Sequence, residues 1–196
     1  SDARKPFMNI QEHISLKELT TMKVGGTARY FCSIEAMQDL TEAFLFVQEK
    51  KVPMMVLGGG SNTLIASGEI EALVVKIEIK GIEWDSHRTD AEPRQRGTGT
   101  EEVIAGAGES WDNLVAETVG RGLWGFENLS GIPGTVGAAP IQNIGAYGAE
   151  IKDTLLWVEV FNTKTGKVEK FTNEECRFGY RDSIFKKPEG KGFIVM

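Results

Sequence analysis

The sequence contains few cysteines and histidines and no long hydrophobic run. Its 196 residues include two of each, and the spacing of Cys32 and Cys176 matches no zinc-binding pattern. We expect both cysteines to be free thiols, because disulfides are rare in a reducing cytosol. No apolar run approaches the roughly 18 residues that a membrane helix needs, and the N-terminus lacks the apolar segment of a secretory signal. These features predict a cytoplasmic protein without a metal site or membrane insertion.

Positive charge is not in excess either. Lysine and arginine sum to 22 and aspartate and glutamate to 28, which gives a net charge of −6. An acidic chain without a basic stripe is a poor candidate for nucleic-acid binding. An anionic small molecule would need donors supplied locally by the fold. The hydrophobic share of 41% is typical of a globular protein of one domain or two small ones.

The familiar catalytic and nucleotide-binding motifs are missing. The chain has no P-loop, and Gly106-Ala107-Gly108 is followed by Trp111 where a dinucleotide-binding fingerprint needs its third glycine. The motifs of zinc proteases and of serine hydrolases are absent as well. The sequence therefore gives no support to metal catalysis or serine hydrolysis.

The apolar pattern predicts strands and helices in alternation at the start of the chain, which favours an α/β unit there. We expect strands at 28–34, 52–57 (an edge strand, because it contains Pro53), 73–77, 102–105, 155–161, 168–171 and 192–196, and helices at 36–47 and 111–119. Ser33 and Ser110 are the expected N-caps, and Gly120 and Gly122 can end the second helix.

Three further segments carry weaker signals. Residues 172–175 fit the capping box of a short helix. The polar residues 85–101 suggest a hairpin loop or an insertion. His87 within that segment, like His13, is expected to face solvent without a role.

Glycine is abundant. It accounts for 23 of the 196 residues, and this share is well above the usual one of roughly 7%. The apolar run 52–57 is followed by Gly58, Gly59, Gly60, Ser61 and Asn62. Successive N–H groups of such a loop can form a nest that suits a pyrophosphate, and the two side chains add donors. A tight turn without a ligand is the alternative.

A second glycine-rich stretch covers residues 125–148. Pro133 could occupy the first position of a short helix, and small residues would leave that backbone bare on one side, so that a flat aromatic ligand could lie against it. Close packing of helix on strand is the alternative. Polar groups for the edge of a ring could come from Gln142 and Asn143. The small residues that would leave the backbone bare for a ligand are Gly134, Gly137, Ala138 and Ala139.

Arg181 follows Tyr180 in a polar loop near the C-terminus. A guanidinium there could clamp a carboxylate or a phosphate. The alternative is a surface arginine paired with Asp182.

Taken together, LGGGSN (57–62), ENLSGIPGTVGAAPIQNIGAYG (127–148) and CRFGYRDSIFK (176–186) resemble the MurB family, the UDP-N-acetylenolpyruvoylglucosamine reductases of bacterial peptidoglycan synthesis. The segment TTMKVGG (20–26) is similar to the family's N-terminal part. The resemblance covers nearly the whole chain from about residue 8.

The resemblance implies an α+β fold, the two-subdomain FAD-binding fold of the vanillyl-alcohol-oxidase (PCMH) type. It implies a small α/β subdomain at 8–80 and a larger subdomain at 81–196 that is incomplete at its C-terminal end, with the C-terminal substrate domain absent. Residues 1–7 are expected to be a cloning remnant or an extension. The implied FAD-binding residues are Gly58, Gly59, Gly60, Ser61, Asn62, Pro133, Gly134, Gly137, Ala138, Ala139, Gln142, Gly145 and Ala146.

The resemblance also implies an activity, which is the reduction of an enolpyruvyl ether by NADPH through tightly bound FAD. Arg181 would be the catalytic residue that stabilises the enolate, and Tyr180 would lie on the substrate side. The family's glutamate and proton-donating serine lie beyond residue 196, so we expect an inactive FAD-binding fragment of a monomeric cytoplasmic enzyme of cell-wall biogenesis, linked to cell shape and cell division. The alternatives are another flavin oxidase or dehydrogenase of the same fold, or a non-catalytic FAD-binding module.

Overall fold

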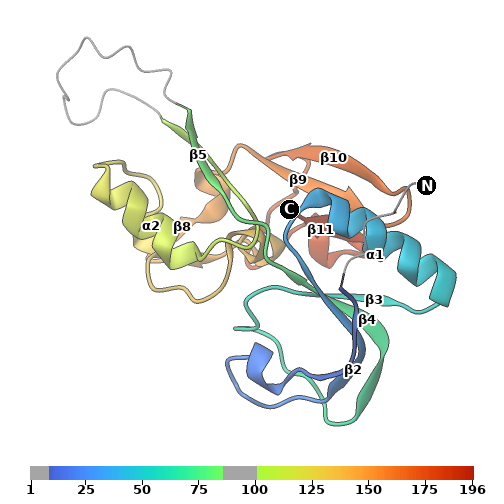
Figure 1. The fold of residues 1–196 in the computed structure, drawn as a ribbon. Helices are drawn as coiled ribbons and strands as arrows, with labels where there is room; N and C mark the ends of the chain where they lie inside the picture. Colours follow the sequence, from blue (N-terminus) through green and yellow to red (C-terminus); the bar gives the residue numbers. More distant parts are fainter. Residues whose placement is uncertain (1–8, 86–100) are drawn as a thin grey trace, which may run out of the picture.

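The computed structural model describes residues 9–85 and 101–196, in which a four-stranded sheet and a three-stranded sheet pack around one long helix (Figure 1). The first sheet has the order β1-β2-β4-β3. Strand β1 pairs antiparallel with β2, whereas β2 and β3 both run parallel to β4. The strand bounds are β1 Gln11–Ser15, β2 Thr27–Ile34, β3 Met54–Leu57 and β4 Glu69–Ile77. The expected edge position of the Pro53 strand is confirmed, and β4 lies between the two strands that flank α1 in the sequence.

Helix α1, Met37–Lys50, lies between the two sheets (Figure 1). Its buried residues Leu40, Ala43 and Val47 belong to the same core cluster as residues of β4 and of β9. The expected cap at Ser33 is wrong, because Ser33 lies in β2. Instead the Asp39 carboxylate accepts hydrogen bonds from the backbone N–H groups of residues 35 and 36, at 2.8 and 2.9 Å. A first-turn acid thus satisfies the exposed donors at the helix start.

A hairpin and the second helix follow the first sheet. Strands β5 (Ile82–Asp85) and β6 (Glu102–Ala105) pair antiparallel, so the expected hairpin is confirmed, although its intervening residues 86–100, with His87, lie outside the described residues. Helix α2, Trp111–Gly120, is capped by Ser110 as expected, through the N–H of Asn113. Val119 is exposed, although the apolar pattern of residues 111–119 predicts that it shares one face with Trp111, Leu114 and Val115.

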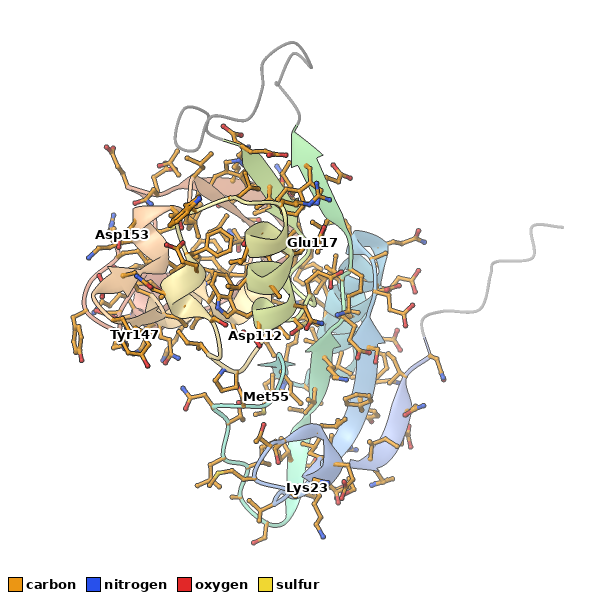
Figure 2. All side chains as sticks on the ribbon, turned by 90° about the vertical axis from the view of Figure 1, so that its left-hand side faces the viewer. Lys23, Met55, Asp112, Glu117, Tyr147 and Asp153 are labelled. Carbon is orange, nitrogen blue, oxygen red and sulfur yellow. The ribbon has the colours of Figure 1, made fainter. Side chains whose placement is uncertain are left out.

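One side-chain triad fixes helix α2 against this hairpin. The Trp84 indole donates to Glu117 at 3.1 Å, and the Arg121 guanidinium lies 3.9 Å from the centre of the Trp84 ring. Arg121 also donates to Glu117. Figure 2 labels Glu117 on α2 beside the hairpin strands. An arginine stacked on an indole and tied to a shared carboxylate keeps the helix and hairpin in one arrangement.

The second sheet has the order β10-β9-β11 and is antiparallel throughout. Its strands are β9 Trp157–Asn162, β10 Lys167–Thr172 and β11 Phe193–Val195, and a short β7–β8 pair joins Gly145–Ala146 to Ala149–Glu150. Thr172 and Glu175 exchange both hydrogen bonds of the expected capping box, but a turn follows instead of a helix. Short 3₁₀ turns lie at Lys17–Leu19, Glu127–Leu129, Val136–Ala138, Pro140–Gln142, Ile151–Asp153, Ile184–Lys186 and Pro188–Gly190.

Two other expectations can be compared with the fold. His13 is exposed, but it is not idle, because its Nδ1 lies 2.6 Å from a carboxylate oxygen of Glu69 on β4, on the far side of β2. The subdomain boundary at residue 80 stays a prediction, since one core cluster contains residues from both sides of it. None of the helices in the described ranges is both long and apolar enough to cross a membrane.

Candidate functional site

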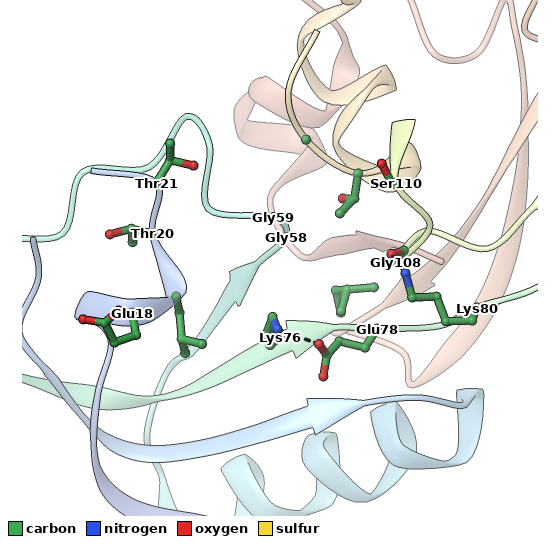
Figure 3. A pocket seen from close by; sticks show the side chains of 14 residues that line it. Glu18, Thr20, Thr21, Gly58, Gly59, Lys76, Glu78, Lys80, Gly108 and Ser110 are labelled. Carbon is green, nitrogen blue, oxygen red and sulfur yellow. Dashed lines mark hydrogen bonds and ion pairs between the residues drawn. The ribbon is translucent and has the colours of Figure 1, made fainter. Parts of the chain in front are cut away.

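Two cavities meet between the first sheet and the second glycine-rich stretch, and both are lined by Gly134 and Thr135. The larger has a volume of about 460 Å³ and the smaller of about 260 Å³. The larger is lined by residues 18–21, 58, 59, 76–78, 80, 108, 110, 134 and 135 (Figure 3), and the smaller by 61, 62, 111, 132–135, 138, 139, 142 and 144. The loop 58–62 thus borders both cavities.

The loop 58–62 is fixed by its own backbone. Gly60 has a φ of +66°, and a Cβ there would lie 2.1 Å from the carbonyl oxygen of Leu19. The N–H of Thr21 donates to the Gly60 carbonyl at 3.1 Å. Within the described part of the chain, no hydrogen bond uses the N–H of Gly59, Ser61 or the residue between them. The loop can therefore offer those N–H groups to an anion, as a nest does.

Two side chains tie this loop to the second glycine-rich stretch, although the sequence suggests them only as donors to a pyrophosphate. Ser61 Oγ donates to the carbonyl of Pro133 at 3.1 Å, and Asn62 Nδ2 donates to Oε1 of Gln142 at 3.2 Å. Residues about 70 to 80 positions apart in the chain thus form one wall. The Asn62 and Gln142 amides keep further polar capacity at the edge of the smaller cavity.

The second stretch differs from the expected helix. The short helix begins at Val136 with Thr135 before it, so the expectation that Pro133 occupies its first position is wrong. A Cβ on Gly137 would lie 2.5 Å from the Cβ of Ala107, and the Gly137 N–H donates to the Ala107 carbonyl at 2.9 Å. Close packing therefore explains Gly137. Ala138 and Ala139 do line the smaller cavity, beside apolar walls from Trp111, Ile132, Pro133 and Ile144.

Asn143 serves the protein itself rather than a ligand ring, which corrects the expectation for this residue. It is fully buried with a φ of +46°. Its Nδ2 donates to the Gly179 carbonyl at 2.9 Å, and its Oδ1 accepts from the N–H of Lys152 at 3.2 Å. Both ends of the amide are used, so Asn143 fastens the loop that carries Arg181 to the glycine-rich stretch.

Arg181 does not pair with Asp182, so that alternative is wrong; Asp182 pairs with Lys187 instead. The Arg181 guanidinium donates to the carbonyl of Asn143 at 3.3 Å and to the carbonyl of Gly145. A Cβ on Gly145 would lie 2.6 Å from a guanidinium nitrogen, so the missing side chain makes room for Arg181.

Tyr180 and Arg181 lie outside the residues that line the two cavities. The Tyr180 side chain is 85% exposed, and the Arg181 guanidinium carbon lies 5.4 Å from its ring centre. Tyr147, labelled in Figure 2, is exposed as well and lies one residue after the expected flavin-side residue Ala146 in β7. The loop therefore presents a fixed cation with the exposed ring of Tyr180 beside it.

Sequence reasoning missed a row of charges along the larger cavity, formed by Lys76, Glu78 and Lys80 (Figure 3). The period-two alternation of apolar and charged residues in 75–80 carries the signal, because alternate residues of a strand share one face. The Lys76 ammonium lies 2.5 Å from the Glu78 carboxylate. This hydrogen bond lowers the pKa of Glu78, against the opposing effect of partial burial, and a hydrogen bond with Ser33 adds to the lowering.

The site suits one long ligand with an anionic middle and a flat ring. The larger cavity combines backbone donors with two ammonium groups, and the smaller has apolar walls with amides at its edge. Gly58 and Gly59 would direct any Cβ toward Thr135 and Gly134, which also line this junction, so side chains there would narrow it. Among the described residues, no cluster of histidine, cysteine, aspartate or glutamate could hold a metal ion.

Comparison with known proteins agrees with this geometry. Two similar curated proteins are UDP-N-acetylenolpyruvoylglucosamine reductases, from Ralstonia nicotianae (41% identical over 186 residues, 95% of this chain and 52% of the relative) and Pseudomonas fluorescens (42% over 189 residues, 96% and 52%). The chain thus spans about half the length of the curated relatives it matches.

Solved structures point the same way. A crystal structure of UDP-N-acetylenolpyruvylglucosamine reductase (MurB) from Thermus caldophilus has a TM-score of 0.71 and 32% identity, over 96% of this chain and 60% of that one. A VAO-type flavoprotein from Myceliophthora thermophila has a TM-score of 0.60 at 17% identity, over 88% and 31%, and so shows the fold alone. The expected vanillyl-alcohol-oxidase-type α+β fold is confirmed.

A family model described as the FAD binding domain matches residues 28–172, a range that includes the loop 58–62 and the stretch 133–146. Because this match covers most of the chain, the chain belongs to the family of FAD binding domains.

Proposed function

We propose that this chain is the FAD-binding part of a UDP-N-acetylenolpyruvoylglucosamine reductase, which uses NADPH to reduce an enolpyruvyl ether in peptidoglycan precursor synthesis. The observation that carries the proposal is the junction of the two cavities at Gly134 and Thr135, between the loop 58–62 and the stretch 133–146. Relatives with that activity are about 41% identical over nearly the whole chain. We assign cofactor binding, one catalytic arginine and one substrate-side tyrosine to these residues.

In this proposal, the loop 58–62 holds the diphosphate through its N–H groups, and the smaller cavity holds the flavin ring against Pro133, Ala138 and Ala139. Gln142 offers its amide to the polar edge of the ring, and Gly145 and Ala146 continue that wall. Bound FAD would supply a ring that takes a hydride from NADPH and gives one to the substrate. The protein contributes orientation and exclusion of water at this ring.

Arg181 has the role of stabilising the charge that develops beside the substrate carboxylate. Its guanidinium is held by two backbone carbonyls, so it is oriented before the substrate arrives. A planar fork of fixed direction is suited to two carboxylate oxygens. Tyr180, largely exposed next to it, lies where a substrate could contact its ring. We place the protein in the cytoplasm, where nucleotide sugars and NADPH are found; the monomeric state stays a prediction.

The first test is cofactor binding by the 196-residue chain. We expect a purified yellow protein with a flavin absorption spectrum, and a fluorescence titration of the apoprotein that saturates with FAD. Lysozyme treated in the same way is the control for unspecific flavin adsorption. An apoprotein that is folded by circular dichroism but does not bind FAD would contradict the proposal.

The second test separates the two half-reactions in a full-length reductase that contains this chain. We expect Arg181→Lys to leave flavin reduction by NADPH unchanged and to slow flavin reoxidation by the enolpyruvyl substrate by a factor of about 10²–10³, the usual cost of losing one such donor. Arg177→Lys is the matched control, because Arg177 lies four residues away and pairs with Glu189 at 3.5 Å. Stopped-flow absorbance measures both steps. Reoxidation at the parent rate in Arg181→Lys would remove this arginine from the chemistry.

A further inference from the structure

Among the described residues that line the larger cavity, Lys76 is a cation whose ion pair does not link distant parts of the chain. The lining of this cavity includes two lysines among the described residues, Lys76 and Lys80. Lys80 donates to the Gly108 carbonyl and lies 3.7 Å from the Glu109 carboxylate, which in turn accepts from the N–H of Gly81. These contacts fix the turn between β4 and the hairpin. Within the described ranges, the ammonium of Lys76 has one ion-pair partner, Glu78, two residues further along the chain.

The two glutamates that line this cavity, Glu18 and Glu78, also have ion-pair partners. Glu18 lies 3.7 Å from Lys23, at the protein surface. Glu78 has the Lys76 ammonium and, in addition, a hydrogen bond with Ser33. If Lys76 turned away, Glu78 would keep the contact with Ser33. The pair can therefore open without leaving a bare carboxylate in the cavity.

The loop 58–62 offers neutral donors only, because it contains glycine, serine and asparagine. A dinucleotide diphosphate carries two negative charges, and the whole chain is itself acidic at −6. Gly58 and Gly59 line the same cavity as Lys76, and Figure 3 shows the Lys76 side chain beneath this part of the loop. The site thus has a positive charge next to its backbone nest, on a lysine side chain that is 27% exposed.

On the basis of the proposed FAD binding, we propose that Lys76 is the charged ligand of the cofactor diphosphate and that Glu78 competes with the diphosphate for it. Without cofactor, the ammonium is bound by Glu78. With cofactor, it exchanges that carboxylate for a phosphate oxygen, and Glu78 retains Ser33. The pair then lowers affinity for the adenosine-diphosphate end while it keeps Lys76 ordered in the empty protein.

The experiment measures dissociation constants of three ligands by flavin fluorescence and calorimetry. FAD carries the diphosphate and the ring, ADP carries only the diphosphate end, and riboflavin carries only the ring. We expect Lys76→Gln to weaken FAD and ADP about tenfold or more, the usual loss for a charge-assisted hydrogen bond, and to leave riboflavin unchanged. The dependence of FAD affinity on salt should become shallower.

Glu78→Gln is the decisive variant, because it should act in the opposite direction. Removal of the competing carboxylate should tighten FAD and ADP about threefold, in line with the small worth of partly exposed charge pairs. A pair with a merely structural role predicts weaker or equal binding in both variants. Should Lys76→Gln fail to fold, as judged by thermal melting, Glu78→Gln still decides the question alone.

A matched control pair is available on the surface of α1, where Lys50 lies 3.6 Å from Glu49. Lys50→Gln and Glu49→Gln change the net charge by the same amounts and should leave all three constants unchanged. The inference is overturned if the parent binds FAD and Lys76→Gln binds it equally well, if riboflavin weakens as much as FAD, or if Glu78→Gln weakens FAD. A parent chain that binds no FAD would overturn the proposed function together with this inference.

Discussion

The carbonyl oxygen of Leu19 occupies the place where a side chain on Gly60 would have to lie, since a Cβ there would be 2.1 Å from that oxygen. From the sequence alone, a substitution at Gly60 is expected to reduce cofactor binding more than stability. The contact with Leu19, together with the φ of +66°, reverses this expectation. Gly60 lets the loop 58–62 pack against the 3₁₀ turn Lys17–Leu19. A substitution there should therefore affect the stability of the fold more than the binding of a ligand.

We therefore expect Gly60→Ala to lower the free energy of unfolding by about 2–4 kcal/mol, from a left-handed alanine and a backbone clash. Gly59→Ala is the control, because its Cβ would meet the Thr135 side chain at 3.4 Å and the Gly134 backbone at 3.5 Å, both ordinary van der Waals contacts. That variant should fold normally and bind FAD less tightly. Urea denaturation of the apoprotein measures the free energy of unfolding of both variants. A Gly60→Ala protein as stable as the parent would contradict the packing role.

The contact between Gly137 and Ala107 predicts a rescue. Gly137→Ala should destabilise the protein by about 1–3 kcal/mol, because a Cβ there would lie 2.5 Å from that of Ala107. Adding Ala107→Gly removes the clash, so the double variant should be more stable than the sum of the single effects predicts, by about 1 kcal/mol. A double-mutant cycle in urea measures this coupling. Additive effects would mean that Gly137 is required for another reason.

Asn143 should be needed for the stability of the loop that carries Arg181. We expect Asn143→Gly, which tolerates the positive φ, to cost about 2–4 kcal/mol, because the Gly179 carbonyl and the Lys152 N–H both lose a buried partner. Asn113→Ala on the exposed face of α2 should change stability by less than about 0.5 kcal/mol. Thermal denaturation compares the two. Equal melting temperatures for Asn143→Gly and the parent would show that the loop is held by other contacts.

The two cysteines should be inert in the native protein. Burial raises the pKa of the Cys32 thiol to about 12 and that of Cys176 to about 11, and the nearby charges of Asp39 and Glu175 add to the respective shifts. At pH 8 almost no thiolate is present, and thiolate is the reactive form. A chromogenic disulfide reagent should detect no thiol in the native chain and both thiols in guanidinium. Rapid reaction without denaturant would place at least one cysteine at the surface.

Asp112 should make stability depend on acid. Its carboxylate accepts from the Gly131 N–H at 2.6 Å and from the Ser130 hydroxyl at 3.0 Å, and these hydrogen bonds hold its pKa below the ordinary value. A folded-state pKa that is depressed gives stability that is complete above the unfolded-state pKa and is lost as the pH falls below about 4. Asp112→Asn should flatten this acid-side loss, whereas Glu49→Gln should not. Urea midpoints at pH 7 and pH 3 measure the difference.

Much of the fold could be predicted because it depends on local patterns. The apolar strands 28–34, 52–57 and 73–77, the amphipathic helices and the cap at Ser110 all carry their signal within a few residues of sequence. Strand β1 carries none, since its residues are mostly polar and exposed and only pairing with β2 defines it. The cap of α1 was misplaced because Asp39 reaches back from the first turn, a choice that depends on three-dimensional geometry.

The site shows the same division. The loop 58–62 and the stretch 133–146 could be chosen from glycine content and resemblance, and the contacts Ser61–Pro133 and Asn62–Gln142 bring them together. The reason for each glycine could not be read, because Gly137 and Gly145 make room for atoms far away in the sequence. The two carbonyl groups that bind Arg181 and the ion pair of Lys76 with Glu78 likewise depend on the folded chain, so the sequence could not predict them.

Trp111 gives the protein an internal optical probe. Its indole is buried, donates to the Leu129 carbonyl at 2.9 Å and forms part of the wall of the smaller cavity. A flavin absorbs at the wavelengths where tryptophan emits, so a ring seated beside this indole would quench its emission by resonance energy transfer. Trp124, by contrast, is largely exposed and would report unfolding of the surface rather than filling of the cavity. Stepwise filling of the site could thus be followed in real time without a label.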